Sequence, residues 1–319
     1  MESLFINTLM AIVSTAILVL VFWRIGLLLP KPEGKTENLR NFHCAHPPAL
    51  FNKEFKCEAF YLLINIFISQ SVAILLIFAL MKFGADGLPY QVFDKQVGSL
   101  PFVLQVLLGL LVIDISVWIR HGFVHKFLWS FHAVHHSAKE LTWLTTRRLH
   151  PVDQIVMSLI DFVILYVLGF SAEGMAGALA VKYLNNLFVH SNIVLDYPKP
   201  WKYIFVSPNM HRWHHATEKE AHDKNFCVVF AFIDYFMGTY YVPDNALPKA
   251  YGSDIAELDD IEHKSIWKEL WQPFKATRGT TVAHETVKPH TYPLASGPSN
   301  SAQLYGLPAT TRSWRHDTA

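Results

Sequence analysis

Long apolar runs restrict this chain to folds that cross a membrane. They extend over Leu4–Leu29, interrupted only by Arg24, and over about residues 59–81 and 100–119. Each run is long enough, as a helix, to cross a hydrocarbon layer of about 30 Å. Hydrophobic residues make up 51% of the chain and charged residues only 17%, which also indicates a membrane protein. Because the first run lacks the basic start of a signal peptide, we expect it to be retained as a span.

A fourth apolar stretch, residues 154–189, is longer than one span requires. Gly169, Ser171, Glu173 and Gly174 interrupt it near its middle. Such residues favour a break in a helix, so we predict two short helices that form a membrane hairpin. A hairpin returns the chain to the side of the membrane from which it entered.

Basic residues predict the orientation. Only Lys82 and Lys95 lie between the second and third apolar runs, whereas the loops before and after these runs are rich in lysine and arginine. Basic loops face the cytoplasm, so residues 121–150 and everything after residue 190 should share the cytoplasmic face. The active site would then face the cytoplasm, at the endoplasmic reticulum in a eukaryote or at the inner membrane in a bacterium.

Histidines are concentrated on that face. Eleven of the 17 lie between His121 and His222. Residues three and four apart share one face of a helix, so tightly spaced histidines can point at one ion. Packing alone does not require an adjacent His-His pair that recurs further along the chain, and bound metal keeps close imidazoles neutral. The pattern therefore predicts a site for two metals, built around the spacings His121-x3-His125, His132-x2-His135-His136 and His211-x2-His214-His215.

The number of histidines restricts the kind of metal. A structural zinc uses four ligands, and a hydrolytic zinc uses three ligands and a water. Eight or more imidazoles suit two ions with open positions, as in iron sites that activate oxygen, although the spacing leaves two zinc ions possible. Cys44, Cys57 and Cys227 form no C-x-x-C pair, so we expect no disulfide framework and no thiolate site. A net charge of +1 gives no indication of nucleic-acid binding.

Carboxylates are expected to orient some of these imidazoles. Asp114 lies seven residues before His121, on the same helical face, where it could pair with a histidine or make a hydrogen bond between helices. Asp153 could orient His150 in the same way. Asp161 and Asp234 are further candidates for such outer partners.

The motifs that surround these residues resemble the fatty acid hydroxylase/sterol desaturase superfamily over about residues 100–242. The resemblance rests on motifs that occur in the order His121-Gly-Phe-Val-His125, Leu128-Trp-Ser-Phe-His132-Ala-Val-His135-His136-Ser137, Arg148-Leu-His150-Pro151-Val-Asp153, Phe188-Val-His190-Ser191-Asn192, His211-Arg-Trp-His214-His215, Asn225-Phe226 and Asp234-Tyr-Phe-Met-Gly238-Thr239.

This resemblance implies an all-α integral membrane protein with a four-helix transmembrane stalk and a helical cytosolic cap that binds two non-haem iron ions. Zinc could replace the iron during purification. His150 and Asn186 would be further ligands or outer partners, since many members of the superfamily have a histidine at the position of Asn186. The ligands carried over are His121, His125, His132, His135, His136, His190, His211, His214 and His215.

The activity implied by the resemblance is lipid oxidation that uses O2 and two electrons. Hydroxylation of a C–H bond is our first hypothesis, and desaturation of a lipid or sterol is the second. A histidine-rich metal-binding or transport protein is a third hypothesis, but a transporter would place its ligands inside the spans. The lipid would come from the bilayer. Because the sequence has no flavin, haem or ferredoxin motif, a separate cytochrome b5- or ferredoxin-type reductase system should donate electrons.

We expect four regions along the chain. Residues 1–99 hold the first transmembrane helices, and residues 100–242 form the catalytic domain, including the hairpin at 154–189. Residues 243–275 should contain an amphipathic helix that opens at a capping box, Asp254-Ile-Ala-Glu257, stops at Pro273 and packs on the catalytic domain or, less favourably, lies in the membrane interface. Residues 276–319 are expected to form a flexible tail.

Overall fold

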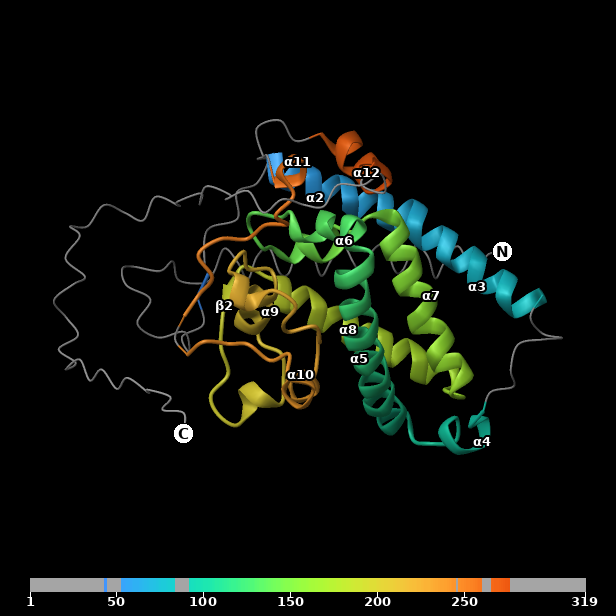
Figure 1. Ribbon diagram of the computed structural model, residues 1–319. Helices are drawn as coiled ribbons and strands as arrows, with labels where there is room; N and C mark the ends of the chain where they lie inside the picture. Colours follow the sequence, from blue (N-terminus) through green and yellow to red (C-terminus); the bar gives the residue numbers. More distant parts are fainter. Residues whose placement is uncertain (1–42, 45–52, 84–91, 245, 260–264, 276–319) are drawn as a thin grey trace, which may run out of the picture. The chain divides into compact units, whose positions relative to one another are not determined.

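The computed structural model describes residues 43–44, 53–83, 92–244, 246–259 and 265–275, and Figure 1 shows how their helices are arranged. The apolar run Leu4–Leu29 and the predicted tail lie outside the described residues. Helices predominate, and the strands β1 (His43–Cys44) and β2 (Ile193–Val194) pair antiparallel. The helices are α2 (Lys53–Ile64), η1 (Asn65–Ser69), α3 (Gln70–Phe83), α4 (Asp94–Val97), α5 (Phe102–Phe127), α6 (Trp129–His136), η2 (Trp143–Arg147), α7 (Pro151–Val167), α8 (Ala172–His190), η3 (Trp201–Tyr203), α9 (Pro208–His214), η4 (Lys219–Ala221), α10 (Ala231–Met237), α11 (Ala256–Asp259) and α12 (Ile266–Lys275).

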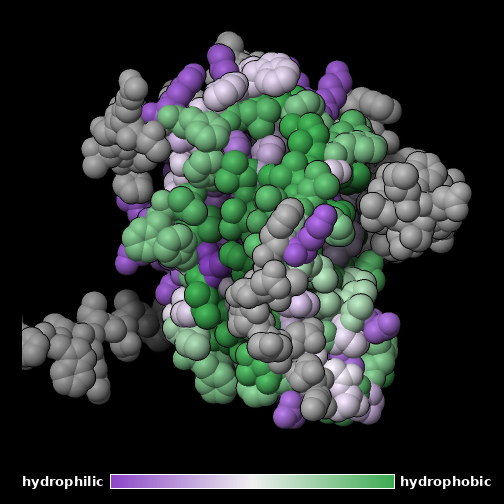
Figure 2. All heavy atoms as spheres, turned by 90° about the vertical axis from the view of Figure 1, so that its right-hand side faces the viewer, coloured by the Kyte–Doolittle hydropathy of each residue, from purple (hydrophilic) through white to green (hydrophobic). Residues whose placement is uncertain are grey.

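Two helical stretches are long and apolar enough to cross a membrane. The helices α2, η1 and α3 run on from one another, and residues Lys53–Lys82 form the first stretch, while α5 forms the second. Leu75 and Phe78 of α3 are 66% and 64% exposed, and Figure 2 shows that apolar side chains cover much of the face on that side. The second and third apolar runs therefore form helices as predicted. Within the described residues these are the two stretches long and apolar enough to span a membrane, so the four-helix stalk stays a prediction.

The stretch at 154–189 forms two helices, as predicted. Helix α7 ends at Val167, and α8 begins at Ala172. Gly169 lies between them with a φ of 87°, a left-handed conformation that glycine adopts without strain. The Ser171 hydroxyl then caps α8 by accepting a hydrogen bond from the Gly174 N–H at 3.1 Å.

Helices α5 and α8 lie side by side (Figure 1) and pack closely through small residues. A Cβ atom added at Gly109 of α5 would lie 2.8 Å from the Cβ atom of Ala178 in α8. Small residues let two helix backbones approach in this way, and the contact brings the ends of both helices to the histidines. The core around it contains Leu110, Ile113, Val117, Leu165, Phe170, Ala178, Val228 and Val229.

The predicted C-terminal helix differs from its expected form. Among its described residues are the helices α11 and α12, separated at the non-helical Ser265, and Pro273 lies inside α12, which ends at Lys275. Asp254 has a φ of 59°, which is not the extended conformation of an N-cap residue, so the predicted capping box was wrong. A proline lacks the N–H group that would bond to the preceding turn, but the residues after it can still be helical. Pro273 therefore does not stop α12, which continues to Lys275.

Helix α12 packs on the rest of the fold through one buried ion cluster. The Arg148 guanidinium, fully buried, contacts Glu54 of α2 at 2.7 Å and Glu269 of α12 at 3.3 Å. It also donates hydrogen bonds to the Val134 carbonyl at 3.0 Å and to the Ser137 hydroxyl at 2.8 Å. Arg148 therefore ties α2 and α12 to the end of α6, the short helix that carries three of the predicted ligands.

Candidate metal centre

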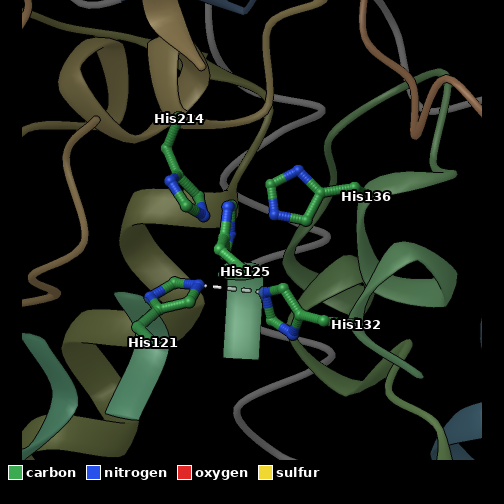
Figure 3. A group of neighbouring side chains, drawn as sticks. All are labelled: His121, His125, His132, His136 and His214. Atoms are coloured by element: carbon green, nitrogen blue, oxygen red, sulfur yellow. Dashed lines mark hydrogen bonds between the residues drawn. The ribbon is translucent and has the colours of Figure 1, made fainter. Parts of the chain in front are cut away.

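The structure brings the nine histidines that the resemblance nominates into two groups, within each of which one ring nitrogen per residue lies within 4.8 Å of the others. All of them are buried except His125, which is half-buried. The five-histidine group, whose side chains point toward one another in Figure 3, contains His121, His125, His132, His136 and His214. The four-histidine group contains His135, His190, His211 and His215.

Histidines that belong to one sequence motif are divided between the two groups. Helix α6 sends His132 and His136 to the five-histidine group and His135 to the four-histidine group. Successive residues of an α-helix are rotated by about 100°, so neighbours along the chain can face different sites. Helix α9 does the same, because His214 joins the first group while His211 joins the second.

Outer hydrogen bonds determine which ring nitrogen faces inward in the five-histidine group. The Nδ1–H of His121 donates to the Phe226 carbonyl at 2.9 Å, and that of His132 donates to Asp153 Oδ2 at 2.9 Å. A carbonyl and a carboxylate can only accept here, so each Nε2 atom carries a lone pair. These two Nε2 atoms lie 2.9 Å apart, as the dashed line in Figure 3 marks. Two lone pairs at this separation repel each other unless a cation lies close to both.

The other members of the group offer nitrogens in the same way. His214 donates from Nδ1 to the Lys224 carbonyl at 2.8 Å, and His125 Nδ1 lies 3.3 Å from Asp223 Oδ1. The Nε2 atoms of His125, His136 and His214 are buried and have no hydrogen-bond partner among the described residues. A buried polar atom without a partner costs about 1–3 kcal/mol. A metal ion bound by these nitrogens would remove that cost, so the donor set fits a metal.

The four-histidine group also brings ring nitrogens close together. The Nδ1–H of His190 donates to the Asn186 carbonyl at 2.8 Å, so its Nε2 atom is a bare acceptor. That atom lies 3.1 Å from Nε2 of His135 and 2.8 Å from Nε2 of His211, which in turn lies 3.2 Å from Nε2 of His215. Four ring nitrogens thus converge around one point, which again fits a bound cation.

Burial keeps these imidazoles in the form that binds metal. For five of the imidazoles, loss of solvent lowers the pKa well below its usual value of 6.5, and neighbouring histidines lower it further. These rings are therefore neutral at neutral pH, and a neutral imidazole is the metal-binding form. The histidines concerned are His135, His136, His211, His214 and His215.

Two of the predicted outer carboxylates contact the backbone of residues 226–230 and not an imidazole. Asp114 accepts hydrogen bonds from the backbone N–H groups of residues 228–230 at 2.6–3.1 Å and does not pair with His121. Asp234 accepts from the N–H groups of Phe226 and Cys227, both at 2.9 Å. Together they hold the segment whose Phe226 carbonyl orients His121. Their distance from the imidazoles could not be predicted, because the segment that intervenes is remote in the sequence.

The remaining candidates lie outside both groups. The spacing predicted that Asp153 orients His150, but Asp153 instead contacts His132. His150 caps α7, with Nδ1 accepting from the Val152 N–H at 3.2 Å and Nε2 placed 3.1 Å from the Leu270 carbonyl, so neither nitrogen is free for a metal. Asn186 orients His190 through its backbone carbonyl, while its side-chain oxygen is buried without a partner among the described residues. A metal contact from Asn186 stays a prediction.

The site also depends on a loop that sequence reasoning did not single out. Asp223 and Asn225 have φ values of 55° and 58°, a left-handed conformation that Asn and Asp tolerate better than most residues. The Asn225 side chain donates to the carbonyls of Met210 at 3.0 Å and Tyr241 at 2.7 Å. This loop therefore presents the Lys224 carbonyl to His214 and the Asp223 carboxylate to His125. The Asn225-Phe226 motif was the available signal.

Comparison with known proteins shows what the segment around this site is similar to. Residues 106–239 match the model of the fatty acid hydroxylase family. The chain is 30% identical over 176 residues to the ornithine lipid hydroxylase OlsE of Rhizobium tropici, an alignment that covers 54% of this chain and 51% of that protein. It is 26% identical over 144 residues to the alkylglycerol monooxygenase of Caenorhabditis elegans, covering 44% of this chain and 27% of the relative.

A third relative widens the range of reactions. The very-long-chain aldehyde decarbonylase GL1-4 of Oryza sativa subsp. indica is 25% identical over 213 residues, which cover 60% of this chain and 33% of the relative. The chain thus spans about half or less of the length of these three relatives. No solved structure matches the chain significantly. The matched segment, residues 106–239, contains both histidine groups and their outer partners, and it is similar to the fatty acid hydroxylase family.

Proposed function

We propose that this protein is a membrane-bound, non-haem di-iron monooxygenase that hydroxylates a C–H bond of a lipid. The observation that carries the proposal is the convergence of inward-facing ring nitrogens in two separate histidine groups. One ion would lie in the five-histidine group and the other in the four-histidine group. Bound iron would supply the activation of O2 that lets an unactivated C–H bond be oxidised.

The chain's own residues would hold the reacting centre in place. The outer hydrogen bonds of His121, His132 and His190 would fix the ring orientations before any ion binds, so that each Nε2 atom already faces the metal position. Burial of the imidazoles excludes water from the centre. Exclusion of water favours oxidation of the lipid over the release of reactive oxygen species.

Lipid would reach the site from the bilayer side of the five-histidine group. The Trp129 ring lies 5.0 Å from the rings of both His125 and His136 and covers this group. Phe123 and Phe127 of α5, close to Trp129 in the chain, are 53% and 61% exposed. Apolar side chains at this edge suit the entry of a lipid chain, whereas electrons would come from a separate cytosolic donor.

The names of the relatives support a lipid substrate. One hydroxylates ornithine lipid, and another is a monooxygenase of alkylglycerol. Two of the three therefore insert oxygen, which favours hydroxylation here over desaturation.

The proposal is tested by turnover and metal content together. The full chain, purified in mild detergent and reconstituted with ferrous iron, is supplied with O2, a reductase system and a membrane lipid extract. We expect roughly two iron ions per chain and lipid products heavier by one oxygen atom, measured by mass spectrometry. Products that lack two hydrogens would identify a desaturase, and products shortened by one carbon would identify a decarbonylase. One tightly bound metal or none would contradict the two-metal centre.

A further inference from the structure

A buried cluster of charges that includes no histidine lies where α5, α7 and α8 meet. The Arg120 Nη2 atom lies 3.2 Å from Asp161 Oδ1, and Lys182 Nζ pairs with the other carboxylate oxygen of Asp161. The three side chains are only 7–15% exposed. One carboxylate is thus shared by two cations among helices whose other side chains are largely apolar.

Arg120 has more donors than this cluster uses. Its Nε and Nη1 atoms are buried without a hydrogen-bond partner among the described residues. The residue as a whole is only 9% exposed. A guanidinium normally donates through several N–H groups at once, and its fork matches the two oxygens of a carboxylate or phosphate. A buried arginine with two unused donors is costly unless an anion completes it.

No other carboxylate in the described chain supplies that anion. Asp114 is the next carboxylate within electrostatic range of Lys182, but its two oxygens accept three backbone N–H groups from residues 228–230. Within the cluster, Asp161 Oδ1 is an ion-pair partner of Arg120 Nη2 but accepts no hydrogen bond from the described residues, and no acceptor of the described chain meets the Nε and Nη1 atoms of Arg120. The Arg120 guanidinium therefore differs from that of Arg148, which two glutamates, a serine and a carbonyl surround.

The cluster is connected to the metal centre by helix geometry. Lys182 lies eight residues before His190 on α8, and Asp161 lies eight residues after Asp153, the partner of His132, on α7. Eight residues of helix extend about 12 Å. The Asn186 side-chain oxygen, buried and without a partner among the described residues, lies between Lys182 and His190 on the same face. It could accept a hydrogen bond from a hydroxyl or amine of the same ligand.

We propose that Arg120 and Lys182, which both pair with Asp161, bind the carboxylate or phosphate of an anionic lipid headgroup and so select the substrate. The inference rests on the proposed lipid oxidation for its biological meaning, but the binding site stands on its own geometry. A headgroup bound here would leave a lipid carbon about 12 Å away within reach of the four-histidine group.

Lipid binding tests this site without turnover. The full chain with its metals, in mild detergent, is titrated with radiolabelled N-oleoylglycine, dioleoyl phosphatidic acid and neutral dioleoylglycerol. We expect at least one anionic lipid to bind about tenfold more tightly than dioleoylglycerol, and the better of the two identifies the anion as carboxylate or phosphate. Equal binding of all three lipids would overturn the proposal.

Matched variants assign the preference to this cluster. Arg120→Gln should reduce the affinity for the preferred anionic lipid about tenfold and leave dioleoylglycerol unchanged, whereas Lys126→Gln, an exposed cation on the same helix, should change neither. Metal content and thermal unfolding check that each variant is folded. If Arg120→Gln does not fold, Lys182→Gln replaces it with the same expectation. A folded variant that keeps the full preference overturns the proposal.

The two proposals fail in different ways. A chain that oxidises lipids but does not prefer anionic ones refutes this site and leaves the monooxygenase. A chain that selects anionic lipids through Arg120 but oxidises none keeps this site and refutes the monooxygenase.

Discussion

His132 Nδ1 lies 2.9 Å from Asp153 Oδ2, and both side chains are almost completely buried. The pair joins the short helix α6 to the first turn of α7. It also fixes the tautomer of His132, so that Nε2 faces the five-histidine group.

Replacing Asp153 should therefore weaken the metal centre while the fold persists. In Asp153→Asn, the amide can present its nitrogen to His132 and reverse the preferred tautomer. Loss of such an outer partner commonly lowers metal affinity or activity about 10–100-fold. Competition with a chelator measures the affinity, and Glu173→Gln, an exposed carboxylate on α8, is the control. An unchanged affinity in Asp153→Asn would show that this pair does not orient a ligand.

Adjacent histidines should serve different ions. Because His135 and His136 belong to different groups, His135→Ala and His136→Ala should each lose about one of two metals, and the double variant should lose both. Elemental analysis of the purified protein gives the count. His222→Ala, which lies outside both groups, should lose none. Loss of a single metal from the double variant would mean that both residues bind the same ion.

The buried Arg148 cluster should dominate the local stability of α6 and α12. Arg148→Met leaves the Glu54 and Glu269 carboxylates buried without their cation, which typically costs about 3–5 kcal/mol. Thermal unfolding and protease sensitivity at the C-terminal helix report the change. Lys268→Met alters an exposed cation of α12 and should have little effect. Equal stability of the two variants would show that the cluster contributes nothing.

Close packing of α5 on α8 should make Gly109 intolerant of larger side chains. A Cβ atom there would meet the Cβ atom of Ala178 at 2.8 Å, so Gly109→Val should cost about 1–3 kcal/mol. Gly122→Ala is the matched control on the same helix, because its added Cβ atom would lie 3.7 Å from Phe226. Unfolding in detergent measures both. A neutral Gly109→Val would mean that the two helices can separate freely.

Membrane sidedness follows from the proposed hairpin at α7 and α8. Cysteines introduced at Lys126 and Lys219 should react with an impermeant reagent from the cytoplasmic side, and one at Ser99, near the other end of α5, should react only from the opposite side. Labelling of Lys126 and Lys219 sites from opposite sides would be incompatible with the shared histidine groups and would require a different topology.

The sequence by itself determined the elements and the identity of the clustered residues. Apolar runs predicted the helical stretches at Lys53–Lys82 and Phe102–Phe127, and the interruption at Gly169 predicted the break between α7 and α8. The histidine spacings and the family resemblance named the nine residues that the structure brings together. These features are local, since periodicity and length depend only on neighbours in the chain.

Only the tertiary structure decided how those residues are used. It divided the pair His135-His136 between two groups, paired Asp153 with His132 and brought Arg120 and Lys182 to the same carboxylate, Asp161. Spacing shows which residues share a face of one helix, but not where that face points. The direction depends on how helices distant in the sequence pack, and here it is set by contacts such as Gly109 on Ala178 and Arg148 between Glu54 and Glu269.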